Sequence, residues 1–117
     1  MEFKYKSKES KESRISQSKE LLEKYPDKIP VILEKDPACK LIELGKTKYL
    51  LERKCTANQV MEMIRKKTTL KEQDALFLQV RAKFSITGEK TIGEIYDTYK
   101  DADGFLYVMF TTELIYG

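Results

Sequence analysis

The sequence predicts an α+β domain, with charged helices at the N-terminus followed by strands that alternate with helices. Three observations lead to this prediction. Residues 105–110 form an unbroken β-favouring run that is entered through an Asp-Gly turn at 101–104. Residues 28–35 alternate in the period of two that a strand requires, and residues 57–67 place apolar side chains at helical spacing. At 117 residues the chain has the size of one domain.

The first 24 residues are dominated by lysine, glutamate and serine. Sparse apolar residues at Ile15, Leu22 and Tyr25, with Ser18 and Leu21 between them, give a narrow stripe at helical spacing. It predicts one or two short helices on the surface of the domain, ending before Pro26. We therefore divide the chain into a helical arm, residues 1–26, and a core, residues 27–117, which form one compact domain. The lysines of the arm indicate either a solvated face or a basic surface for tubulin tails or lipid headgroups.

Two strands are expected next, at residues 28–35 and 47–53. In the first strand, Ile29, Val31 and Leu33 face the core, while Pro30 and Ile32 face outward. Because proline cannot donate a ladder hydrogen bond, Pro30 favours an edge or the start of a strand. The second strand carries large apolar residues on both faces. This indicates either burial on both sides or one side that is kept for a ligand.

The remaining elements are marked by capping boxes. Thr56 and Gln59 open a helix over residues 57–67, and a similar pair at 69–72 predicts a further turn of helix. A strand is expected at 75–81, a loop at 85–88, and a short helix after the third box at 91–94. The final strand should be central in the sheet and covered on one face. The resulting order of β, β, α, β, short α and β is the β-grasp pattern of ubiquitin.

Composition excludes several classes of protein. Histidine is absent, so a histidine-dependent triad or metal site is excluded. Cys39 and Cys55 fit no metal spacing and are expected to be free thiols. No apolar run approaches the roughly 20 residues that span a bilayer, and no signal peptide is evident. We expect a soluble cytosolic or nuclear protein that is not an enzyme, needs no metal or cofactor, and does not bind nucleic acid, since its net charge is only +3.

Several blocks of sequence resemble those of the ubiquitin-like autophagy modifiers, the family of the GABA-receptor-associated protein and microtubule-associated light chain 3. The blocks occur in the family's order and spacing, at residues 24–32, 46–50, 64–67, 74–77 and 103–108. The resemblance extends over residues 3–117. It implies a ubiquitin-like β-grasp fold with two additional N-terminal helices.

The resemblance also implies conjugation through the final residue, Gly117. In the family, an activating enzyme adenylates the terminal glycine, and a conjugating enzyme transfers it to the amine of phosphatidylethanolamine. A cysteine protease processes the precursor or removes the lipid. Glycine suits such narrow active sites because it has no side chain to obstruct them. The implied location is the cytoplasm, and the membrane of the autophagosome or a related vesicle once the lipid is attached.

Finally, the resemblance implies that receptors bind through short aromatic-x-x-aliphatic motifs added as a strand at residues 46–51. The first motif pocket would be formed by Leu21, Pro30, Ile32, Lys48, Leu50 and Phe105. The second would be formed by Tyr49, Leu51, Cys55, Val60 and Met63. Acidic residues beside the motif would meet Lys28, Lys46, Arg65 and Lys67. Some of the same apolar residues also suit packing beneath the N-terminal helices.

Two functions follow from these features. The leading hypothesis is a lipid-conjugated modifier that acts in autophagosome formation and recruits receptors. The alternative is an adaptor that is not conjugated and that links vesicles or receptors to microtubules through the lysines of residues 4–11.

Overall fold

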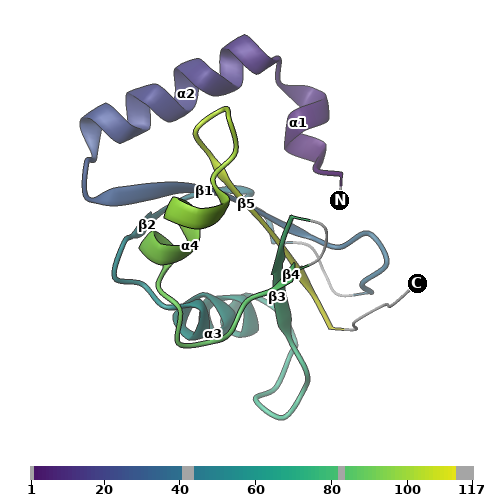
Figure 1. The fold of residues 1–117 in the computed structure, drawn as a ribbon. Helices are drawn as coiled ribbons and strands as arrows, with labels where there is room; N and C mark the ends of the chain where they lie inside the picture. Colours follow the sequence, from purple (N-terminus) through teal and green to yellow (C-terminus); the bar gives the residue numbers. More distant parts are fainter. Residues whose placement is uncertain (1, 41–43, 82–83, 113–117) are drawn as a thin grey trace.

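The computed structural model describes residues 2–40, 44–81 and 84–112, which fold around one mixed sheet (Figure 1). Its strands lie in the order β2-β1-β5-β3-β4. β1 pairs antiparallel with β2 and parallel with β5, and β5 pairs antiparallel with β3. The elements are α1 Lys4–Lys8, α2 Lys11–Lys24, β1 Lys28–Lys35, β2 Lys48–Glu52, α3 Ala57–Lys67, β3 Phe77–Val80, β4 Phe84–Ser85, α4 Ile92–Tyr99 and β5 Leu106–Thr111. The predicted α+β class, β-grasp order and two N-terminal helices are confirmed.

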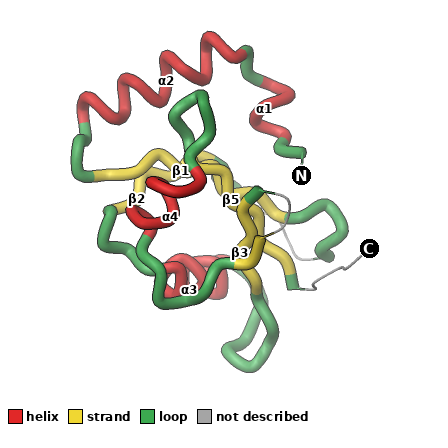
Figure 2. The backbone as a smooth tube through the Cα atoms, viewed as in Figure 1, coloured by secondary structure: helices red, strands yellow, loops and turns green. Residues whose placement is uncertain are grey.

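β5 lies at the centre of the sheet, and all six of its residues are buried. Leu106, Val108 and Phe110 contribute to an apolar cluster with α3 and α4. Tyr107 and Met109 belong to a second cluster on the opposite face, beneath α1 and α2. The prediction that this strand is covered on one face is therefore wrong, because the N-terminal helices cover the other face (Figure 2).

The first face of the sheet is covered by α3 and α4. The side chain of Thr56 accepts a hydrogen bond from Gln59 N at 3.2 Å, and Gln59 Oε1 accepts from Thr56 N at 2.9 Å. This reciprocal box fixes the start of α3, as predicted. Val60 and Ile64 then meet Ile29, Val31 and Leu33 of β1 in the main core.

The second face is covered by α1 and α2, and here the predicted apolar stripe is partly wrong. Ile15 and Tyr25 are 40% and 37% exposed, whereas the buried residue of α2 is Ser18. The hydroxyl of Ser18 donates to Asp103 O in the loop between α4 and β5. Figure 1 shows this loop reaching up to α2. The inward face lies within the predicted stripe, but this polar contact decides which of its positions is buried, and apolar spacing alone cannot indicate that.

Three further boundaries differ from the sequence expectations. Residues 69–72 form no helix, because Asp74 accepts from Lys71 N at 2.9 Å and closes a turn instead. The predicted loop at 85–88 begins with the short strand β4, and β3 is shorter than expected.

Pro30 is the third residue of β1, and the pairing of β1 with β5 begins at the next residue, Val31. Pro30 therefore lies before the first residue that pairs with β5, where its missing N–H removes no hydrogen bond between these two strands.

Candidate functional site

β2 is the outermost strand at one end of the sheet, as the motif-binding hypothesis requires. Leu33 N donates to Thr47 O at 2.9 Å, and Arg53 N donates to Asp27 O at 3.4 Å. Because hydrogen-bonded pairs alternate along an antiparallel ladder, the backbone groups of Tyr49 and Leu51 face β1. Those of Lys48, Leu50 and Glu52 face away from the sheet. This edge therefore presents a backbone template to which a further strand can pair.

The structure brings together the residues predicted for the first motif pocket. Leu50 pairs with Pro30 and Lys48 pairs with Ile32, so these four lie side by side on the α2 face. Leu21 of α2 packs against the cluster that contains Ile32 and Phe105. Ile32 and Phe105 are each 0% exposed, so they form a covered floor. Leu21 and Leu50 are half-buried and Lys48 is exposed, so these three members remain accessible to a ligand.

The second predicted group lies on the opposite face of β2, against α3. Tyr49 and Val60 belong to the main core, with 5% and 3% exposure. Leu51, Cys55 and Met63 are half-buried and pack against that core. The phenol oxygen of Tyr49 is buried and has no hydrogen-bond partner within the described residues. Burial raises the pKa of Tyr49 above its usual value, so its hydroxyl remains protonated.

Two of the four predicted acidic-motif contacts meet at one ring. The ammonium groups of Lys46 and Lys67 lie 5.0 and 5.2 Å from the centroid of Tyr49. Two like charges beside the buried ring of Tyr49 form a local positive field that suits a carboxylate. Arg65 instead donates to Lys71 O at 2.5 Å and Asp74 O at 2.9 Å, so it holds the loop after α3. Lys28 lies at the far end of the pair of strands, opposite Glu52.

Sequence reasoning missed Gln17, which connects the first pocket to the helices. Lys48 Nζ donates to Gln17 Oε1 at 2.9 Å, and Tyr5 OH donates to the same oxygen at 2.6 Å. Gln17 thus joins α1, α2 and β2 at the rim of the pocket. Its position four residues before Leu21 places both side chains on one face of α2, which was the available sequence signal.

Gly117 lies outside the described residues, which end just after β5. Asp36 N donates to Phe110 O at 2.9 Å, and Cys39 Sγ lies 3.6 Å from Thr112 Oγ1. The loop after β1 therefore holds the end of β5. Thr112 is the last described residue.

Two further features of the described residues concern the Cys55 thiol and the possible metal ligands. Burial and the nearby carboxylate of Glu52 raise the pKa of the Cys55 thiol, which disfavours the nucleophilic thiolate. Within the described ranges, no three histidine, cysteine, aspartate or glutamate side chains gather as metal ligands. No helix described here is both long and apolar enough to cross a bilayer.

Comparison with known proteins agrees with this geometry. The family described as "Autophagy protein Atg8 ubiquitin like" matches residues 13–117. The crystal structure of ATG8 from Trypanosoma brucei is similar along the whole of both chains, with 32% sequence identity and a TM-score of 0.89. Both findings span the edge strand, the two groups of apolar residues and the strand that leads to the tail. The chain therefore belongs to the Atg8 family of ubiquitin-like autophagy proteins.

Proposed function

We propose that this protein is a modifier that becomes linked through Gly117 to phosphatidylethanolamine and recruits receptors to autophagosomal membranes. The observation that carries the receptor part is the edge strand β2, with outward backbone groups and half-buried apolar residues on both faces. Membership of the Atg8 family supports the conjugation part. The protein moves between the cytoplasm and the membrane of an autophagosome or related vesicle.

Receptor binding uses pairing along β2 for affinity and two apolar contacts for selectivity. An aromatic-x-x-aliphatic peptide that pairs with Lys48 and Leu50 places side chains toward both faces of the sheet edge. One side chain meets Leu21 and Leu50 on the α2 face. The other meets Leu51 and Met63 on the α3 face. Acidic residues of the motif are attracted by Lys46 and Lys67, which flank the same edge.

Conjugation depends on enzymes that act on the tail. Gly117 would supply the carboxylate, and the activating and conjugating enzymes would supply the catalytic groups. A cysteine protease processes the tail or removes the lipid. Attachment of one lipid with two acyl chains provides stable anchoring, since each buried CH₂ contributes about 0.8 kcal/mol.

Calorimetric titration with N-methylated peptides tests the pairing directly. Methylation of a backbone nitrogen that faces β2 should weaken binding about fivefold, since a hydrogen bond contributes about 1 kcal/mol. Methylation at the alternate positions, which face away, should have little effect. Leu50→Glu should abolish binding, whereas Ser85→Glu, at the opposite edge of the sheet, should leave it unchanged. Equal losses at every methylated position would show that the peptide does not bind as an added strand.

The adaptor hypothesis has less support from the fold. Lys6, one of the lysines it relies on, is bonded to Asp101 Oδ1 at 2.6 Å. Phe3 is buried in the second cluster, so the start of the arm is packed on the domain. Co-sedimentation with tubulin at low salt distinguishes the two functions. Removal of residues 1–12 should abolish it if the adaptor hypothesis holds.

A further inference from the structure

The loop that follows β1 forms a closed turn against the end of β5. Cys39 N donates to Asp36 O at 2.9 Å, and Ala38 N donates to Asp36 Oδ1 at 2.9 Å. Asp36 N in turn donates to Phe110 O at 2.9 Å. Residues 36–39, the Asp36 turn, are therefore attached to the last part of the central strand.

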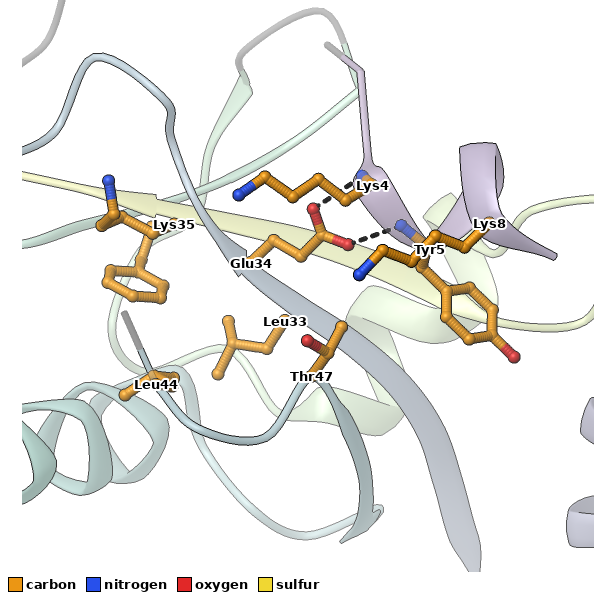
Figure 3. Close-up of a pocket in the computed structure, with 9 residues that line it drawn as sticks. Lys4, Tyr5, Lys8, Leu33, Glu34, Lys35, Leu44 and Thr47 are labelled. Atoms are coloured by element: carbon orange, nitrogen blue, oxygen red, sulfur yellow. Dashed lines mark hydrogen bonds between the residues drawn. The ribbon is translucent and has the colours of Figure 1, made fainter. Parts of the chain in front are cut away.

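A lysine of β1 fixes the position of this turn. Lys35 Nζ donates to Cys39 O at 2.5 Å and to Asp36 O at 3.4 Å. Figure 3 shows the side chain of Lys35 pointing away from the carboxylate of its neighbour, Glu34. Lys35 is also paired with Phe110 between β1 and β5. The Asp36 turn thus has a defined place beside the strand that leads to the tail.

The turn makes a contact beyond both strand ladders. Among the described residues, the pairs of β5 end with Phe110 opposite Lys35 and Thr111 opposite Phe77. Thr112 comes next, and its Oγ1 lies 3.6 Å from the Sγ of Cys39, within hydrogen-bond distance for sulfur. Cys39 is only 6% exposed, so water competes little for this weak bond. The contact therefore restrains the backbone one residue past the sheet.

We propose that the Asp36 turn, through Cys39, positions the tail for the enzyme that activates Gly117. The inference rests on the proposed conjugation through Gly117 and deepens it. Gly117 lies five residues after Thr112, a reach of at most about 18 Å when the chain is fully extended. Each residue that an enzyme orders on binding costs conformational entropy. A restrained Thr112 leaves one residue fewer to order, which lowers KM and leaves kcat unchanged. Because Cys39 acts through Thr112, it is a positioning residue.

Exchange of pyrophosphate into ATP by the activating enzyme tests this with the full chain as substrate. In that step the Gly117 carboxylate forms a mixed anhydride with AMP, and pyrophosphate leaves. Thr112→Val removes the hydroxyl and should raise KM about threefold at unchanged kcat. Thr112→Ser keeps the hydroxyl and should restore the parent KM. Thr98→Val makes the same change at an exposed position in α4 and should have no effect.

Removal of the other partner shows whether the contact itself is the cause. Cys39→Ala should raise KM as Thr112→Val does, and the double variant should be no worse than either single variant. Thermal unfolding of each variant is measured alongside, so that a loss of structure is recognised. Additive losses, an unchanged or lowered KM in Thr112→Val, or equal effects of Thr112→Val and Thr98→Val would overturn the proposal. So would a lower kcat at unchanged KM.

A measurement without enzymes separates this proposal from the proposed function. The NMR order parameter of the Thr112 amide should fall from about 0.85 in the parent to about 0.6 in Cys39→Ala. An unchanged order parameter would overturn the proposal even if Gly117 is conjugated. Absence of exchange with the parent chain would contradict the proposed function, while the order parameter would still decide whether Cys39 restrains Thr112.

Discussion

The face of the sheet under α3 and α4 and the face under α1 and α2 both exclude water, but with different side chains. The first face is a wide apolar cluster that draws on four strands and both helices. The second has a small aromatic cluster, and α2 contributes only Ser18 as a buried residue. The difference shows that the N-terminal helices are held largely by directional polar contacts, which depend on a few specific atoms.

Asp103 is the centre of these polar contacts. Its carboxylate accepts from Arg14 Nη1 at 2.6 Å, from Tyr107 OH at 2.5 Å and from Phe105 N at 2.9 Å. The Asp103 side chain is 1% exposed and that of Arg14 is 14% exposed. Burial and the Asp103 carboxylate raise the pKa of Tyr107 far above its usual value, so the phenol remains a donor. One buried carboxylate therefore connects α2, the loop and β5.

The largest expected effect is on the apolar face. Phe110→Ala removes a fully buried ring from the main core and should lower the free energy of unfolding by about 3–5 kcal/mol. Urea unfolding of the parent and the variant measures the change. A loss below about 1 kcal/mol would contradict the assignment of Phe110 to a tightly packed core.

Asp103→Ala tests the polar face and should cost about 3 kcal/mol, because it leaves Arg14 and Tyr107 without their buried acceptor. A double-mutant cycle with Arg14→Ala separates the pair from the rest of the network. We expect a coupling of at least about 1 kcal/mol. Additive losses would indicate that the two side chains act independently and that the helices are held by apolar packing.

Gly104→Ala should destabilise the fold by about 1–3 kcal/mol. Gly104 has a φ of +94°, and an added Cβ would overlap the Ser18 hydroxyl. Gly45→Ala is the matched control, because a Cβ there meets nothing within 4 Å. Thermal unfolding of both variants decides the point. If the two changes have equal effects, the close approach of α2 to this loop is not required.

The smallest expected effect concerns Lys6 and Asp101, a partly exposed pair joined at 2.6 Å. Burial alone would raise the pKa of Asp101, but the hydrogen bonds from Lys6 and from the backbone of Asp103, together with the charges of Lys6 and Arg14, outweigh it and lower the pKa. A lowered folded-state pKa contributes stability above the unfolded value of about 3.9 and loses it as the pH falls through the folded value. Asp101→Asn should therefore cost less than about 1 kcal/mol at pH 7 and almost nothing at a pH below the folded-state pKa. Urea unfolding at both pH values measures this; an equal cost at both would exclude the ion pair as the cause.

Local signals in the sequence were sufficient for much of the first face. The bounds of β1 agree with the alternation of residues 28–35, and the capping box at Thr56 predicted the start of α3. Both features depend on residues close together in the chain. The edge position of β2 was also expected, through the family resemblance at residues 46–51.

The second face was harder to predict because its contacts join distant parts of the chain. Asp103 was assigned only to a turn, yet its partner Arg14 lies 89 residues away. The alternation of β1 placed Ile32 on the outward face, but it could not show that Phe3, Phe105 and Leu21 surround it there. Ser18 is polar, so no hydrophobic pattern could indicate that it is the buried residue of α2.

The central claim is that the chain is transferred through its last residue to phosphatidylethanolamine. Reconstitution with activating enzyme, conjugating enzyme, ATP and phosphatidylethanolamine vesicles, followed by intact mass spectrometry, tests it most directly. The account predicts a product heavier by one phosphatidylethanolamine less one water, with the amide at Gly117, and no product from Gly117→Ala. Lipidation of Gly117→Ala as efficient as that of the parent chain would contradict it.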